Sequence, residues 1–154
     1  MPFHRFYIPK GLYSDAEKVA LAQAITALYV GPPASLPAFY VVVSFIEHDP
    51  GNFFVSGETK RADNMVHIQV EHLARTFPAG DAGFARKRDF MARYEERLKP
   101  YTSGRGVDWE IVVAESDPQL WNINGMAPPP PQSEGEILWK KENRAIPYEA
   151  DKAV

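Results

Sequence analysis

Runs of hydrophobic residues predict strands at four places along the chain. Residues 3–8 are largely apolar and aromatic until Pro9, and residues 38–46 are apolar almost throughout. Residues 65–73 alternate between apolar and polar side chains, and residues 109–113 form the last apolar run. Continuous apolarity is typical of a strand that is covered on both faces and often parallel, so we expect residues 38–46 to be such a strand.

Apolar residues at intervals of three and four predict two helices between these strands. A capping box at residues 14–17 opens the first helix, which continues to about Val30. The second runs from residue 81 or 82 to about residue 99, where Pro100 ends it. Its predicted apolar side holds Phe84, Met91, Tyr94 and Leu98.

Two successive strand–helix–strand units with right-handed crossovers predict an α+β fold. We expect a four-stranded mixed sheet with two helices on one face and a short β-hairpin. Residues 53–55, after the turn at residues 49–52, are expected to form a short strand. The duplicated β-α-β domain spans residues 1–126.

Residues 127–154 depart from this pattern. Four prolines at 128–131 favour polyproline II, and a second capping box at 133–136 opens a short helix through Trp139. We interpret this segment as a Pro-rich C-terminal arm. It docks either on the same domain or on a neighbouring subunit.

Composition narrows the classes of function. The net charge is −3, which gives no indication of a nucleic-acid or anionic-membrane partner. The chain has no cysteine, no signal-peptide pattern and no apolar run of the ~18 residues that a membrane span needs, so we expect a cytoplasmic protein. His67 and His72 would face opposite sides of a strand, and no phosphate-binding loop occurs, so we expect neither a metal nor another cofactor.

Pro2 is the residue with the most distinctive chemistry. A proline behind the initiator is small enough for Met1 to be removed, which would leave a secondary amine at the start of a strand. An α-amino group titrates near pH ~8, and burial lowers that pKa towards the range of a useful general base. The alternative interpretation is that Met-Pro is a common start with no catalytic meaning.

Five blocks of sequence carry a resemblance to a known family. They are residues 24–29, 38–46, 67–75, 108–110 and 120–130. With the early proline and the duplicated units, the chain resembles the tautomerase superfamily from Pro2 to about Tyr148. More narrowly, it is similar to fungal homologues in the cis-3-chloroacrylic acid dehalogenase-like group. The resemblance implies a homotrimer with active sites near subunit borders and a small carboxylate-bearing substrate.

The family's catalytic residues can be carried over by position. The catalytic proline is Pro2, and the histidine of the first helix falls on Tyr29. The two arginines that hold the substrate carboxylate fall on His72 and Arg75. Each has an alternative structural role: aromatic packing for Tyr29, a satisfied half-buried histidine for His72, and a surface ion pair for Arg75.

Two further positions depart from the family. The tyrosine and glutamate that help to activate water fall near Val112 and within residues 122–124, which contain no carboxylate. Dehalogenation is therefore not the activity we expect. Trp121, Asn122 and Asn124 are candidates for the mouth of a substrate pocket, although a buried indole is more often part of a core.

These observations predict a tautomerase- or isomerase-type enzyme. Pro2 would act as general base and acid on a small oxo acid or enol carboxylate bound by Arg75. One alternative is a non-catalytic scaffold or ligand-binding protein with the same fold. Another is a hydratase or dehalogenase that acts on a haloacrylate-like acid.

Overall fold

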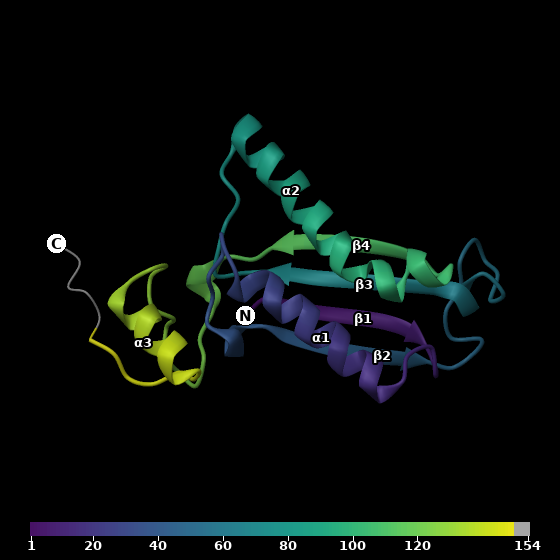
Figure 1. The fold of residues 1–154 in the computed structure, drawn as a ribbon, viewed down its shortest axis with the longest axis horizontal. Helices are drawn as coiled ribbons and strands as arrows, with labels where there is room; N and C mark the ends of the chain where they lie inside the picture. The colour runs from purple at the N-terminus through teal and green to yellow at the C-terminus, as the bar shows by residue number, and fades with distance from the viewer. Residues whose placement is uncertain (150–154) are drawn as a thin grey trace.

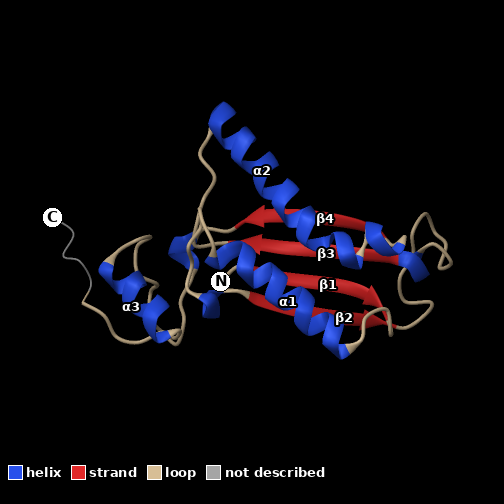
Figure 2. Ribbon diagram, viewed as in Figure 1, coloured by secondary structure: helices blue, strands red, loops and turns tan. Residues whose placement is uncertain are grey.

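One four-stranded mixed sheet forms the centre of the computed structural model, which describes residues 1–149 (Figures 1 and 2). Its strands are β1 (Phe3–Pro9), β2 (Val42–His48), β3 (Met65–His72) and β4 (Asp108–Glu115). The spatial order is β2-β1-β3-β4, in which β1 is parallel to β2 and antiparallel to β3, and β3 is parallel to β4. The predicted α+β fold of two β-α-β units is confirmed.

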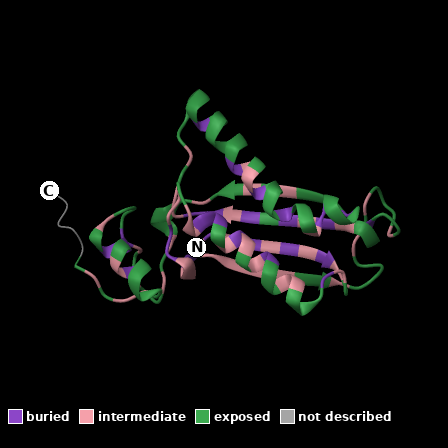
Figure 3. Ribbon diagram, viewed as in Figure 1, coloured by how far each residue is buried: buried purple, intermediate pink, exposed green. Residues whose placement is uncertain are grey.

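The helices α1 (Asp15–Val30) and α2 (Gly80–Leu98) lie on one face of this sheet (Figure 2). The predicted capping box forms: the Ser14 hydroxyl accepts from the Glu17 N–H, and the Ser14 N–H donates to the Glu17 carboxylate. The expectation that Phe84 packs inward is wrong, since its side chain is 69% exposed. It belongs to the N-terminal half of α2, which rises away from the sheet and has no core to pack against (Figures 1 and 3).

Two predicted strands are shorter than expected. Residues 38–40 form a 3-10 turn, and β2 begins only at Val42. Because β2 is an edge strand with mostly half-buried side chains, it is not covered on both faces within residues 1–149. The predicted hairpin near residues 53–55 is reduced to a single bridge between Val55 and Glu58.

The sheet face opposite the two helices carries polar pairs. Arg5 donates to Glu71 at 3.0 Å, and the Tyr7 hydroxyl donates to Gln69 at 3.4 Å. Apolar side chains at the sheet edges remain open to solvent, with Val112 of β4 47% exposed. This face is therefore half-buried within the described chain.

The C-terminal arm folds back onto its own chain. It contains α3 (Glu134–Glu142), on which Trp139 is fully buried against Phe39, Tyr40 and Tyr148. The Trp139 indole N–H donates to the Ile146 carbonyl. Within the described chain the arm packs on its own domain, and docking on a neighbouring subunit stays a prediction. Residues 150–154 of the predicted arm lie outside the described residues.

Candidate functional site

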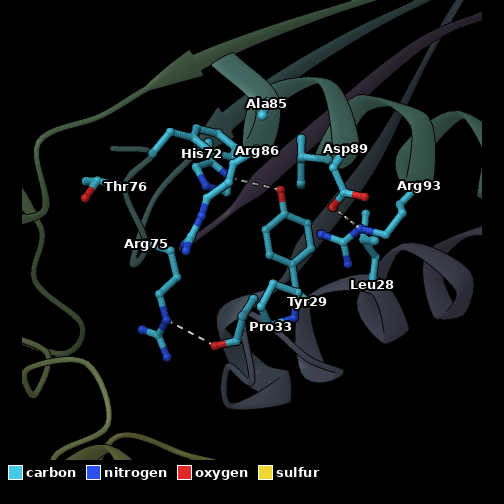
Figure 4. A pocket seen from close by; sticks show the side chains of 13 residues that line it. Leu28, Tyr29, Pro33, His72, Arg75, Thr76, Ala85, Arg86, Asp89 and Arg93 are labelled. Atoms are coloured by element: carbon cyan, nitrogen blue, oxygen red, sulfur yellow. Dashed lines mark hydrogen bonds and ion pairs between the residues drawn. The ribbon is translucent and has the colours of Figure 1, made fainter. Parts of the chain in front are cut away.

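A cavity of about 500 Å³ opens between α1 and α2, next to the end of β3 (Figure 4). Its lining comes from the last turn of α1, the loop after β3 and one side of α2. The volume lies in the range of ~300–1,000 Å³ that proteins use for small-molecule ligands. The predicted site residues Tyr29, His72 and Arg75 all line this cavity.

Tyr29 and His72 form a buried, uncharged pair at this cavity. Tyr29 comes from the last turn of α1 and His72 is the last residue of β3, and the Tyr29 hydroxyl lies 3.3 Å from His72 Nδ1. Burial lowers the pKa of His72 to about 4, although Glu115 opposes this shift, and burial raises the pKa of Tyr29. At neutral pH the phenol therefore keeps its proton and the imidazole is uncharged.

A second histidine–tyrosine pair lies behind the first. His4 Nδ1 is 2.8 Å from the Tyr94 hydroxyl, and the His4 ring meets the Tyr29 ring edge-on at 5.2 Å. Burial, reinforced by the charge of His72, lowers the pKa of His4 to about 3. His4 was not among the predicted site residues, but its alternation with Phe6 on β1 was a signal that it faces the core.

Pro2 lies at the same end of the sheet's strands as this cavity. His4 pairs with Val70 in the antiparallel register of β1 and β3, so two residues earlier on β1 the register brings Pro2 opposite His72. Pro2 is buried, as are the even-numbered residues of β1 that face the helices. The candidate base and the Tyr29–His72 pair therefore lie at the same end of the sheet.

Met1 lines a second cavity of about 480 Å³ together with Glu71, Trp121 and Asn122. Burial lowers the pKa of the Met1 α-amino group to about 5, although the Glu71 carboxylate opposes this shift. The predicted pocket-mouth residues Trp121 and Asn122 thus lie beside the amino terminus. Asn124 does not join them, because it sits exposed in a tight turn with a positive φ of 52°.

Arg75 binds a carboxylate that belongs to the chain itself. Its Nη1 and Nη2 donate to the two carboxylate oxygens of Glu136 on α3, at 3.0 and 2.9 Å. Its Nε donates to the Ala34 carbonyl and Nη1 also donates to the Ala74 carbonyl. Four of the five guanidinium N–H donors are thus engaged, and one on Nη2 remains. The substrate-binding role of Arg75 stays a prediction.

Helix α2 supplies site residues that our sequence analysis did not single out. Arg86, Asp89, Phe90 and Arg93 line the cavity between the helices, and Phe77 joins them from the loop before α2. The signal was their spacing, since side chains three, four and seven residues apart share one side of a helix. Only the packing of α1 against α2 shows that this side borders a cavity.

The fold is that of a tautomerase-type protein, and the family comparison agrees. A family model described as "putative oxalocrotonate tautomerase enzyme" matches residues 1–144, and the chain belongs to this family. The predicted resemblance to the tautomerase superfamily is therefore confirmed. A comparison with curated proteins found no match.

Two solved structures resemble the chain over nearly its whole length. RhCC from Rhodococcus jostii RHA1 is 38% identical, with 96% of this chain and 100% of that chain covered and a TM-score of 0.86. A probable enzyme from the thermophilic fungus Aspergillus fumigatus is 39% identical, with 96% and 98% covered and a TM-score of 0.85.

More distant structures share the fold. N1, a member of the cis-3-chloroacrylic acid dehalogenase family, is 19% identical, with 92% of this chain and 98% of that chain covered and a TM-score of 0.70. A fused 4-OT asymmetric trimer is 18% identical, with 82% and 95% covered and a TM-score of 0.61. Within residues 1–149, no helix has the length and apolarity to cross a bilayer.

The buried histidines predict a stability that falls in acid. His72 and His4 have pKa values of about 4 and 3 when folded and near 6.5 when unfolded, so below pH 6.5 the unfolded chain binds more protons. The free energy of unfolding should then fall by about 1.4 kcal/mol per pH unit for each histidine as the pH drops from 6 towards 4. Urea unfolding between pH 7 and 4.5 measures this. His72→Asn should flatten the decline, and parallel declines in variant and wild type would contradict the assignment to His72.

Proposed function

We propose that this chain is a tautomerase- or isomerase-type enzyme in which Pro2, as the amino-terminal residue, acts as general base and acid on a small oxo acid or enol carboxylate. The observation that carries the proposal is the position of Pro2. It is buried just before the start of β1 and lies in register with His72, which lines a cavity of ligand size. Membership of the tautomerase family supports the same class of chemistry.

The surroundings of the amino terminus favour a neutral amine. Burial lowers the pKa of the Met1 α-amino group to about 5. A Pro2 amine exposed by removal of Met1 would lie one residue further into the protein and would feel the same desolvation. An amine with a lowered pKa is neutral to a larger extent at pH 7 and can accept a proton, whereas an ordinary α-amino group near pH ~8 is mostly charged.

In the proposed reaction, the Pro2 nitrogen takes a proton from an atom alpha to a carbonyl, or from an enol hydroxyl. The C–H or O–H bond breaks as an N–H bond forms, and the same proton is then returned at the other end of the enolate. The developing negative charge on the enolate oxygen needs a donor. The Tyr29 hydroxyl and the remaining Nη2 N–H of Arg75 both border the cavity and would serve as donors.

Arg75 also acts as a positioning residue in this proposal. Its bonds to Ala34, Ala74 and Glu136 tie together the loop after α1, the loop after β3 and the C-terminal arm. Both partners of the ion pair are shielded, with side chains 18% and 6% exposed for Arg75 and Glu136. The cavity wall is therefore held in place by an interaction that water screens weakly.

A ligand-binding protein without catalysis is the second candidate. The specific observation in its favour is the engagement of Arg75 by Glu136, which occupies the guanidinium edge that a substrate carboxylate would use. Retention of Met1 would have the same consequence, because the Pro2 nitrogen would then be an amide and not a base.

Replacing Pro2 tests the proposed chemistry. Pro2→Ala should lower kcat for ketonisation of phenylenolpyruvate by about 100-fold or more, the typical contribution of a general base. The absorbance of the enol reports turnover. Pro50→Ala, in an exposed turn, is the matched control and should turn over normally.

The pH profile of the wild type sharpens this test. Because the amine must be neutral to accept a proton, kcat/KM should be the same at pH 8 and pH 7 and should fall only at acid pH, where the amine becomes protonated. Full activity in Pro2→Ala would sink the proposal.

We further propose that the chain forms a homotrimer. The half-buried sheet face, with its exposed Val112 and polar pairs, is the surface we expect neighbouring subunits to cover. The shared fold with a trimeric fused 4-OT supports this arrangement. Sedimentation equilibrium should give the mass of three 17.3-kDa chains. A single-chain mass at micromolar concentration would contradict it.

A further inference from the structure

The cavity between α1 and α2 has one unpaired positive charge. Three arginines and one aspartate line it. Arg75 is neutralised by Glu136, and Arg93 donates from Nε to Asp89 at 2.9 Å. Within residues 1–149, Arg86 is an exposed residue of the cavity lining with no carboxylate within ion-pair distance and no hydrogen-bond partner. Figure 4 shows the Arg86 side chain projecting from α2 at the cavity. An anion entering the cavity would therefore find Arg86 available without displacing an existing partner.

The floor of the same cavity is aromatic and uncharged. The His72 and Phe77 rings stack at 4.7 Å with an interplanar angle of 15°, and Phe90 meets His72 edge-on at 5.1 Å. Tyr29 meets Phe90 in the same way at 5.8 Å. Because the desolvated His72 is neutral at pH 7, this floor presents π faces and edges to a ligand without a charge.

We propose that this cavity binds a monocarboxylic acid with a flat, apolar body such as an aryl ring, and that Arg86 holds the carboxylate. A single unpaired guanidinium matches one carboxylate, which it can grip through two parallel N–H bonds. The aromatic floor matches a ring that lies along His72 and Phe77. An acid of only three carbons would leave most of the roughly 500 Å³ unfilled. The inference rests on the proposed function in taking this cavity as the substrate's site, and it adds the substrate class and a specificity residue on α2.

Binding of 3-phenylpropanoate to the full-length protein tests the proposal. This acid has the ring and the carboxylate but no carbonyl at which a proton could be moved, so it reports binding without turnover. Isothermal titration calorimetry should show at least about 10-fold weaker binding in Arg86→Ala than in wild type, as expected for loss of a hydrogen bond between charged groups. Propanoate, which lacks the ring, should bind at least about 10-fold more weakly than 3-phenylpropanoate to wild type, since the ring's buried area is lost.

Arg88→Ala is the matched control. Arg88 lies two residues further along α2, is exposed and is not part of the cavity lining, so its loss removes the same charge without removing the contact. It should bind 3-phenylpropanoate within about 2-fold of wild type. If Arg86→Ala unfolds, Arg86→Gln keeps an aliphatic stem with an uncharged polar end and should show the same loss of binding.

Equal affinity of the Arg86 and Arg88 variants would overturn the inference, as would equal affinity of wild type for propanoate and 3-phenylpropanoate. Failure of the inference is separable from failure of the proposed function. Pro2→Ala should still bind 3-phenylpropanoate normally, so its activity tests the base while the Arg86 variants test the binding site.

Discussion

The antiparallel pairing of β1 with β3 is the constraint on which the rest of the structure depends. It places β1 in the interior of the sheet. The start of the chain therefore lies beside His72, the last residue of β3. The pleat then turns Pro2 and His72 to the face covered by the helices, where the end of α1 brings Tyr29 within reach of His72. A register slip of one residue would turn His72 to the opposite face relative to Pro2 and take the site apart.

Burial lowers the pKa of three basic groups at this end of the sheet. It lowers the pKa of the Met1 amine and of the two buried histidines, His4 and His72, so each favours its neutral form. The positive charge lies on the arginines that line the cavity between the helices, which His72 also lines. The proposed amine base, a neutral imidazole and the arginines of the cavity are groups that fit proton transfer within an organic anion.

Periodicity predicted the four strands and two long helices because the core imposes a repeat of two or 3.6 on the residues that face it. It misplaced Phe84, since a repeat cannot show where a helix extends past its sheet. The partner of Arg75 was beyond prediction, because Glu136 is 61 residues away on a helix whose docking depends on the burial of Trp139. Arg86 was equally hidden: neighbouring cations on one helix look alike until a second helix packs against one side.

The proposed mechanism requires a free secondary amine at Pro2. Intact-mass spectrometry of the protein purified from its natural host tests this requirement most directly. The proposed mechanism predicts a mass that lacks the Met1 residue and carries no acyl group on the amine. A mass that includes Met1 would make the Pro2 nitrogen an amide, contradict its role as a base, and favour a ligand-binding protein with a tautomerase fold.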